Sequence, residues 1–239
     1  CRWGAAHVSG GGSAILSHSS ISNCSALHGG AAHVDGRGTS LLILQRTSIV
    51  VCTASGHAGA ILSQEGSEVV LTANSSIEDC EAGSRRVMAD PSGGALSVQA
   101  SILTVNSSRL SRCRVTTGTS KGGGIFAGAD SAVQLDVDAS FVSCTSAYSG
   151  GGLDMQRCTL SMKGCTVENC ATGAWGGGGA SFHAMVHVHL VSCLVDRCSS
   201  TSQGGGMRVE SSRLTIEWTV IRDCWALVGG GVRLGVAAG

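Results

Sequence analysis

The feature that most constrains the fold is a repeat that opens at a glycine cluster and closes at a cysteine. Eight copies occur, the clearest from Gly204 to Cys224, and the interval from the last glycine to the cysteine stays between 18 and 22 residues. The interval from each cysteine to the next glycine varies from 6 to 14 residues. Repeats of roughly 20 to 50 residues indicate a solenoid or an array. We therefore expect the constant part to form a scaffold, the variable part to form a loop, and residues 1–239 to make a single domain.

Each copy contains short segments in which apolar and polar residues alternate. Examples are Leu214 and Ile216, and, directly after a glycine cluster, Met207 and Val209. Such alternation is typical of half-buried strands. An apolar residue also stands three places before every closing cysteine: Ile21, Ile49, Ile77, Leu110, Phe141, Val167, Val195 and Ile221. The glycine clusters, which no Lys-Ser/Thr pair follows, predict tight corners with positive φ or close packing between coils rather than phosphate loops.

These strands cannot bury an apolar face unless neighbouring coils stack on one another. Stacking at the strand spacing of about 4.8 Å pairs the backbone groups of each coil and makes a continuous core. The sequence therefore predicts an all-β, right-handed parallel β-helix of about eight coils and a partial ninth that begins at Gly231, the hand following from the rule for parallel crossovers. A leucine-rich horseshoe is the alternative, but no coil has its leucine and asparagine spacing.

The closing cysteines should stack in a ladder along one corner of this solenoid. Stacked coils bring neighbouring Cα atoms within disulfide range, but they also hold the Cβ atoms about 4.8 Å apart, beyond the usual mean of about 3.8 Å. A column of small buried thiols is therefore the favoured interpretation, with disulfides as the alternative. Cys165 and Cys193, five places before their ladder cysteines, should form part of a second small-residue column, although a bridge between them is an alternative. The ladder comprises Cys24, Cys52, Cys80, Cys113, Cys144, Cys170, Cys198 and Cys224.

Composition excludes several classes of function. The 16 basic and 16 acidic side chains balance, which argues against nucleic-acid binding. No C-x-x-C pair suggests a zinc site, and we expect no metal and no cofactor. No apolar run reaches the roughly 18 residues that span a membrane. The chain begins at Cys1 without a methionine, so we expect a fragment of a longer repeat protein, with further coils at both ends.

Two stretches carry a resemblance to a known family. Cys24 to Ala31 and Cys144 to Leu153 both read Cys, a short variable segment, Gly-Gly and an apolar residue, which resembles the repeats of polymorphic outer-membrane proteins. That family pairs GGA-[ILV] with FxxN, whereas this chain has cysteine in place of the asparagine, as in Phe141-Val142-Ser143-Cys144. The resemblance, and the wider class of pectin-lyase-like β-helices, imply a surface adhesin with glycans or cell-surface proteins as partners, in an extracellular or cell-surface location.

The strongest candidate for catalysis is an acidic pair. Asp136 and Asp138 are two residues apart and should face outward from a strand whose Val133, Leu135 and Val137 point inward, with Lys163 nearby on the next coil. Catalytic sites of enzymes with the β-helix fold lie on such faces, but no acidic cluster builds up on the adjoining coils. We therefore interpret the pair as a solvated surface and assign no catalytic residue.

Histidines offer two further candidates. His187 and His189 should both point outward, and two imidazoles alone make a poor metal site, so we also interpret them as solvated. His7 and His33, each three places after a glycine, should stack on each other, and no function is assigned to them.

The best binding candidate is a basic edge formed by two long loops, residues 81–93 and 114–123. Loops that depart from a rigid repeat often carry binding sites. The hypothesis is that this edge binds an acidic glycan or another anionic partner; the alternative is a solvated loop with Glu81 and Asp90 as counter-charges. The residues of the edge are Arg85, Arg86, Arg112, Arg114 and Lys121.

Together these features predict a non-enzymatic adhesive or structural stalk whose ligand is a glycan. Two alternatives stay open: a carbohydrate-active enzyme, either a polysaccharide lyase or a hydrolase, and an intracellular repeat scaffold. Acidic residues that converge across several coils would favour the enzyme, and a fully reduced cysteine ladder would favour the scaffold.

Overall fold

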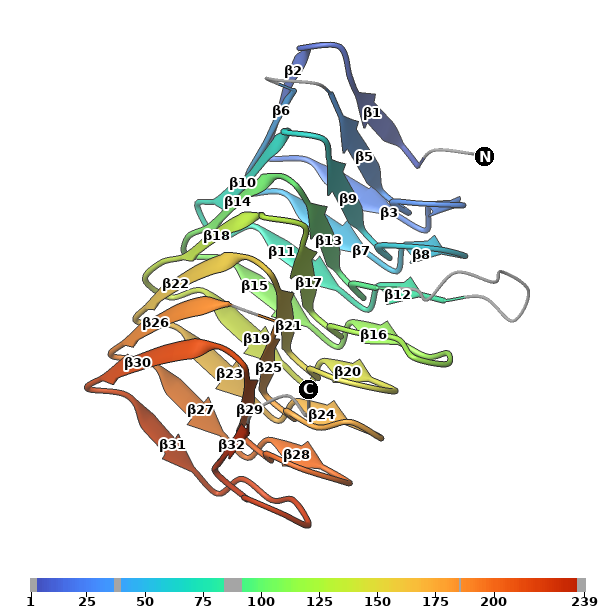
Figure 1. Ribbon diagram of the computed structural model, residues 1–239. Coiled ribbons are helices and arrows are strands. Elements are labelled where there is room, and N and C mark those ends of the chain that lie inside the picture. Colours follow the sequence, from blue (N-terminus) through green and yellow to red (C-terminus); the bar gives the residue numbers. More distant parts are fainter. Residues whose placement is uncertain (1–3, 37–39, 84–91, 185, 236–239) are drawn as a thin grey trace.

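The computed structural model describes residues 4–36, 40–83, 92–184 and 186–235 and shows a parallel β-solenoid (Figure 1). Every regular element in the described residues is a β-strand, and the strands form four parallel sheets, A to D. Each coil of the chain adds one strand to each sheet in turn, so that neighbours within a sheet are one coil apart in the sequence. The predicted all-β solenoid of about eight coils is confirmed. No helix that could cross a membrane is present in the described part of the chain.

The four sheets run the length of the stack. Sheet A contains β1 (Ala6–Val8), β5 (Ala32–Asp35), β9 (Ile61–Gln64), β13 (Leu96–Gln99), β17 (Ile125–Gly128), β21 (Leu153–Gln156), β25 (Ala180–His183), β29 (Met207–Glu210) and β32 (Val232–Gly235). Sheet B contains β2 (Ser13–Ser17), β6 (Leu41–Gln45), β10 (Glu68–Thr72), β14 (Ile102–Val105), β18 (Ala132–Leu135), β22 (Thr159–Lys163), β26 (His187–Val191) and β30 (Arg213–Glu217).

The strands of sheets C and D are shorter. Sheet C contains β3 (Ser20–Ser22), β7 (Ser48–Val50), β11 (Ser76–Glu78), β15 (Arg109–Ser111), β19 (Ser140–Val142), β23 (Thr166–Glu168), β27 (Leu194–Asp196) and β31 (Val220–Arg222). Sheet D contains β4 (Ser25–Ala26), β8 (Thr53–Ala54), β12 (Glu81–Ala82), β16 (Arg114–Val115), β20 (Thr145–Ser146), β24 (Ala171–Thr172) and β28 (Ser199–Ser200).

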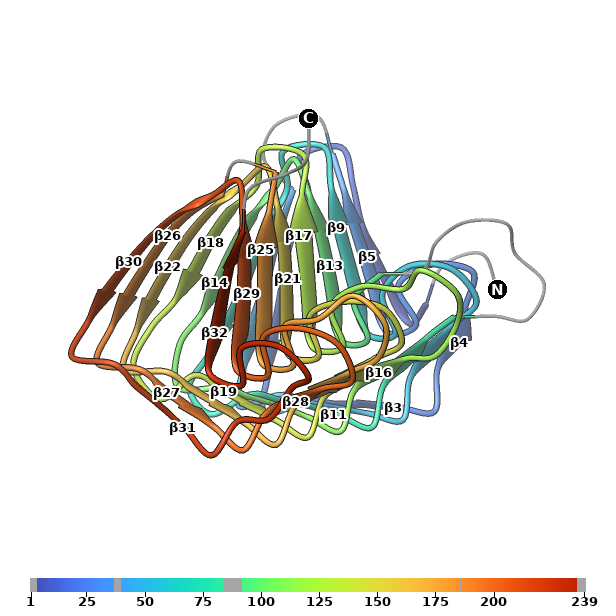
Figure 2. The same ribbon diagram turned by 60° about the horizontal axis from the view of Figure 1, so that its bottom comes forward.

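Sheets A, B and C enclose the core, and sheet D leads into the loops beside it (Figure 2). The apolar residue three places before each cysteine points into this core from sheet C, and Ile77, Leu110 and Phe141 stack as direct neighbours with no exposed surface. Ile21 and Ile221, in the end coils, are only partly buried. The predicted alternation is therefore the packing pattern of the interior.

The glycine cluster is the corner at which the chain turns from the loop into sheet A. Its first position has positive φ, as at Gly150, and its middle position packs against the next coil, since a Cβ on Gly151 would lie 2.3 Å from the carbonyl oxygen of Gly178. The middle glycine, rather than the last one, is the constant position. Alanine takes the third place in four coils (Ala5, Ala31, Ala60 and Ala95).

The cysteine ladder consists of free thiols, buried in all coils except those of Cys24 and Cys224. Each thiol donates to a carbonyl two residues earlier, as Cys113 does to Ser111 at 3.4 Å. Burial, and contact with the neighbouring Cys144 thiol, raise the pKa of Cys113 well above its usual value. These thiols therefore fill the corner as apolar groups, as expected.

The second small-residue column is also confirmed. Cys165 Sγ donates to the Leu135 carbonyl of the preceding coil at 3.1 Å, and Cys193 makes the same contact with Met162 at 3.5 Å. Thr47 occupies this position in an earlier coil and donates to the Leu16 carbonyl at 2.8 Å. Hydroxyl and thiol groups thus serve the same structural purpose in this column.

Candidate functional site

Sheet A differs from the other sheets because most of its inner strands are buried on both faces, as in β5, β9, β13, β21, β25 and β29. The central residue of each strand points away from the core, yet Ser97 and Asp154 have no exposed surface and Arg208 is only 6 % exposed. The loops that follow the sheet D strands fold back over these residues. The result is a groove that follows the stacking axis along the outer face of sheet A, with the loops as one wall.

Three columns of residues make this outer groove of sheet A. The wall column comes from the loops and lies just before each glycine corner: His28, His57, Ser92, Lys121, Ser149, Gly176 and Gln203. The floor column comes from the strand centres: His33, Leu62, Ser97, Phe126, Asp154, Ser181 and Arg208. The rim column lies two residues further along each strand: Asp35, Gln64, Gln99, Gly128, Gln156, His183 and Glu210.

Hydrogen bonds between wall and floor close the groove at some coils. Ser92 Oγ lies 3.2 Å from Ser97 Oγ, and in a later coil the Ser149 hydroxyl donates to the carboxylate of Asp154. Both pairs are five residues apart and bracket a glycine corner. Such pairing is expected, because a buried polar group without a partner costs free energy.

Asp154 is the most deeply buried carboxylate of the groove. In addition to Ser149, it accepts hydrogen bonds from Gln156 Nε2 at 3.1 Å and from His183 Nε2 at 3.2 Å. Three donors thus compensate for the lost hydration of the charge. Because His183 uses Nε2 for this bond, its Nδ1 atom is the acceptor nitrogen of the neutral ring.

Arg208 occupies the floor position two coils beyond Asp154. Its guanidinium lies 3.9 Å from the ring centroid of Trp175, donates to the Trp175 carbonyl at 3.0 Å and pairs with Glu210 at 3.0 Å. The opposite neighbour of Trp175 is Tyr148, at 5.6 Å between ring centroids. This cation and these aromatic rings fix the loops onto sheet A at that end of the groove.

The groove opens into a hollow of about 320 Å³ around Gly128. Here the wall residue is Lys121 and the floor residue is Phe126, a pair that cannot form the hydrogen bond seen between Ser149 and Asp154. The rim position is Gly128, which has no side chain, between Gln99 and Gln156 of the adjacent coils. Both differences leave space, and we call this region the Gly128 hollow; its lining residues are His57, Ser92, Gln99, Lys121, Phe126, Gly128, Ala129, Gln156 and Arg157.

Two cations flank the Gly128 hollow on opposite sides. Lys121 lies in the loop wall, where its backbone forms parallel β-bridges with Ser92 and Ser149 of the adjacent coils. Arg157 directly follows β21 at the corner that leads to sheet B. Among the described residues neither cation has an ion-pair partner, and no described residue of the lining is acidic. Sequence reasoning missed Arg157, Phe126 and Gly128. A signal that could have found them is that Gly128 stands where the two neighbouring coils have Gln99 and Gln156.

The structure divides the predicted basic edge. Arg112 forms ion pairs with Glu78 at 2.9 Å and Asp79 at 2.7 Å, and Arg114 pairs with Glu81 at 2.7 Å, so acidic residues of the preceding coil already compensate both charges. Lys121 instead faces the groove. Arg85 and Arg86 lie outside the described residues.

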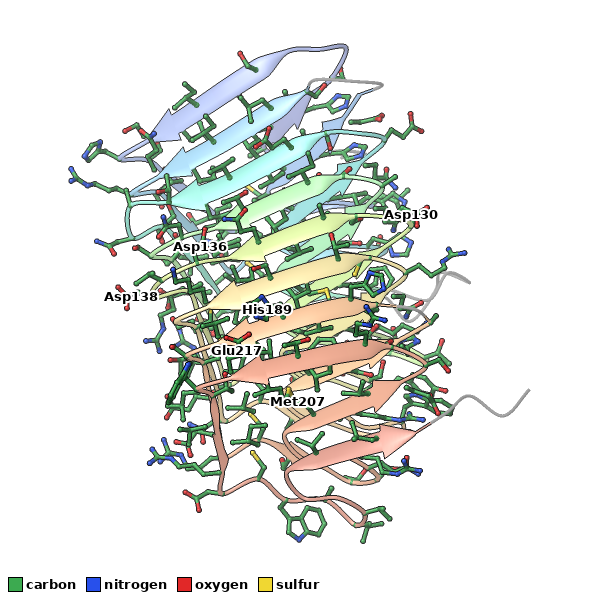
Figure 3. The ribbon with its side chains drawn as sticks, turned by 60° about the vertical axis from the view of Figure 1, so that its left-hand side comes forward. Asp130, Asp136, Asp138, His189, Met207 and Glu217 are labelled. Atoms are coloured by element: carbon green, nitrogen blue, oxygen red, sulfur yellow. The ribbon has the colours of Figure 1, made fainter. Side chains whose placement is uncertain are left out.

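The acidic pair on sheet B is not arranged as predicted. β18 ends at Leu135, and the chain turns there through Asp138, which has a φ of 64°, so that Val137 points to solvent with 51 % of its surface exposed. Asp136 and Asp138 therefore lie at a corner, at one edge of the outer face of sheet B (Figure 3). Neither forms an ion pair with Lys163 within the described residues.

The predicted positions of the histidine side chains are confirmed. His187 and His189 are exposed on sheet B, with Val188 buried between them, and His189 lies 3.0 Å from Glu217 (Figure 3). His7 and His33 stack with ring centroids 5.3 Å apart. No group of three or more histidine, cysteine or acidic residues in the described parts of the chain is arranged to hold a metal ion.

No protein family, no curated protein and no solved structure matches this chain.

Proposed function

We propose that this chain is a non-enzymatic, secreted or cell-surface solenoid that serves as an adhesive or structural stalk and holds a glycan chain in the outer groove of sheet A. The observation that carries the proposal is the rim of the groove. It presents amide groups at Gln64 and Gln99 in successive coils and at Gln156 two coils further on, beside the half-buried ring of Phe126. Amides both donate and accept hydrogen bonds, as sugar hydroxyls require, and an aromatic ring offers an apolar face.

The spacing of the rim supports a glycan over an extended peptide. Rim residues repeat with the coils, about 4.8 Å apart, whereas an extended peptide advances about 3.3 Å per residue. Successive peptide residues would therefore not stay aligned with successive rim residues. The resemblance to polymorphic outer-membrane protein repeats also favours adhesion. A rigid stack that displays one continuous groove suits both a stalk and a ligand that is itself a repeating chain.

Binding to an array of immobilised neutral and acidic oligosaccharides tests this proposal. We expect the folded chain to bind a subset of the glycans, and Gly128→Phe, which fills the hollow, to lose that binding. Thr104→Phe, which places the same side chain on the outer face of sheet B, is the matched control and should bind as the parent does. If the parent bound none of the glycans, or if both variants bound equally well, the groove would not be a glycan site.

A second candidate function is a carbohydrate-active enzyme, which the Asp154–His183 pair favours. A buried carboxylate that orients a partly exposed histidine leaves Nδ1 as a potential general base. We expect no cleavage, and release of new reducing ends from a bound oligosaccharide would contradict that. Loss of such release in His183→Gln, with binding retained, would assign the activity to this pair.

A further inference from the structure

We infer that the Gly128 hollow is a subsite for one carboxylate-bearing sugar residue, a uronic acid, held between Lys121 and Arg157. This inference rests on the proposed glycan function and goes beyond it by assigning the chemistry of a single position in the groove.

Among the rim positions from Asp35 to Glu210, only Gly128 has no side chain, although Gly235 of the end strand β32 also lacks one. At the neighbouring rim positions Gln99 and Gln156 project over the groove, and only Gly128 between them leaves the strand bare. A Cβ added at Gly128 would meet nothing closer than the far end of the Phe126 ring, at 3.3 Å. The backbone therefore does not require glycine at this place, since no carbonyl oxygen of another coil crowds it as it does at Gly151. The ring of Phe126 packs against Gly128, which is itself buried, and both residues line the hollow.

The charges favour an anion. Lys121 and Arg157 come from opposite sides of the groove, and the acidic residues that compensate other cations are absent from the described lining. Arg112 and Arg114, by contrast, already bind carboxylates of the preceding coil. Asp154, the closest buried carboxylate in the floor column, is occupied by three donors. Two cations that have no ion-pair partner within the described part of the chain, beside an open hollow, are suited to a ligand carboxylate.

The floor and the rim favour a sugar ring as the carrier of that carboxylate. Phe126 offers a partly exposed aromatic face, and the amides of Gln99 and Gln156 stand on either side of it. A free inorganic anion would use the two cations but neither the ring nor the amides. A uronic acid uses all of them, with its hydroxyls on the amides and its carboxylate between the cations.

The test compares an oligosaccharide of alternating glucuronate and N-acetylglucosamine with its carboxyl-reduced form, in which each carboxylate becomes a hydroxymethyl group. Affinities for both are measured with the parent chain, with Lys121→Gln/Arg157→Gln, and with Gly128→Gln, which restores the glutamine of the neighbouring coils. Arg213→Gln, which removes an exposed cation from the outer face of sheet B, is the matched control. Thermal unfolding of each variant checks that the stack is intact.

We expect the parent to bind the acidic form roughly tenfold or more tightly than the reduced form, the range given by charge-assisted hydrogen bonds. The Lys121/Arg157 variant and Gly128→Gln should lose this preference, and Arg213→Gln should keep it. Equal affinity of the parent for both forms would overturn the inference and leave the glycan function standing. Binding of neither form would overturn the function and the inference with it. A preference that survived in both groove variants would place the acidic residue elsewhere and would also overturn the inference.

Discussion

Sheets A and B are built from the same alternating strands, but their outer faces are unlike. On sheet B the outward residues are exposed in most coils, from Ile15 in the first coil through Ile102 in the middle of the stack to His187 and His189 near the other end, and they are half-buried in β6 and β10. On sheet A most of the outward residues are buried, with the half-buried Phe126 and the exposed His7 of the first strand as exceptions, and several of the buried ones are polar or charged, such as Asp154 and Arg208. The strands alone do not produce this difference. It arises because the loops after sheet D lie on one face and leave the other open.

The comparison shows how a uniform repeat acquires a local site. On an exposed face, water is available as a hydrogen-bond partner at every coil. A covered face instead requires a partner within the protein for each buried polar group. Two wall and floor pairs meet this requirement by direct hydrogen bonds, one between two serines, Ser92 and Ser97, and one between a serine and a carboxylate, Ser149 and Asp154. Where the pair is Lys121 and Phe126, the cover is incomplete and a hollow results.

The largest expected effect comes from breaking the corner that leads into sheet A. A Cβ in Gly151→Ala would lie 2.3 Å from one carbonyl oxygen and 2.5 Å from another in the next coil, so the coils must separate. We expect a loss of roughly 4 kcal/mol or more in the free energy of unfolding, measured by urea denaturation. Gly164→Ala is the control at the corner after sheet B. Its φ is also positive, at 64°, but its nearest contact is at 3.6 Å, and the left-handed backbone should cost only about 1–2 kcal/mol. Equal losses in the two variants would contradict the close packing at Gly151.

A smaller effect should follow from removing the buried carboxylate of sheet A. Asp154→Ala leaves three hydrogen-bond donors without an acceptor, and we expect a loss of about 2–4 kcal/mol in the free energy of unfolding. Asp136→Ala, at the edge of sheet B, removes a carboxylate that accepts only one bond, from the exposed Gln134, and should change stability by less than about 0.5 kcal/mol. A similar loss in both variants would mean that the cover over sheet A does not isolate Asp154 from water.

Much of this architecture could be predicted from the sequence, because its cause is local and repeated. The glycine-to-cysteine interval fixed the coil, and the apolar residue three places before each cysteine, such as Phe141, identified the strand of sheet C. Small residues at the place of Cys165 predicted the second column. In each case one residue has the same neighbours in every coil, so a pattern in the sequence is also a pattern in space.

The groove could not be predicted in the same way. It depends on contacts between a loop residue and a strand residue across a glycine corner, as between Ser149 and Asp154, and no alternation of apolar residues marks how a loop folds back. The prediction for Val137 was wrong for a related reason. Apolar alternation continues past Leu135, but the left-handed corner at Asp138 ends the strand and turns Val137 outward.

The pH dependence of stability offers a further comparison of the two faces. Burial in sheet A lowers the pKa of His33 below its ordinary value of 6.5, while Gln64 and Asp35 oppose the shift and His7 and His28 add to it. The unfolded chain therefore takes up a proton first as the pH falls. The contribution of His33 to the free energy of unfolding is therefore complete above about pH 6.5. It decreases as the pH falls through that value toward the lower pKa of the folded state.

We expect His33→Leu to lose less stability than the parent between about pH 7.5 and pH 5.5, because one group with a lowered pKa is gone. Leucine fits the site, since Leu62 occupies the same floor position in the next coil. Thr104→Leu, on the outer face of sheet B, removes no titratable group; it is the control and should retain the pH dependence of the parent. The measurement is the urea midpoint at each pH, and an unchanged slope in His33→Leu would contradict the assigned cause.

The smallest effect is expected at the loop edge, which belongs to neither face. Arg112 is exposed and binds Glu78 and Asp79 of the preceding coil, so its charge is both screened by solvent and already compensated. Arg112→Gln should leave the unfolding midpoint unchanged within error, and it should also leave the affinity for the acidic oligosaccharide unchanged. Lys121→Gln, a few residues later in the sequence, should weaken that affinity without altering the midpoint. Both substitutions remove one positive charge, so a difference between their affinities reports the position of the cation rather than the loss of charge itself. If Arg112→Gln weakened binding as much as Lys121→Gln, the basic edge rather than the covered groove would be the anion site.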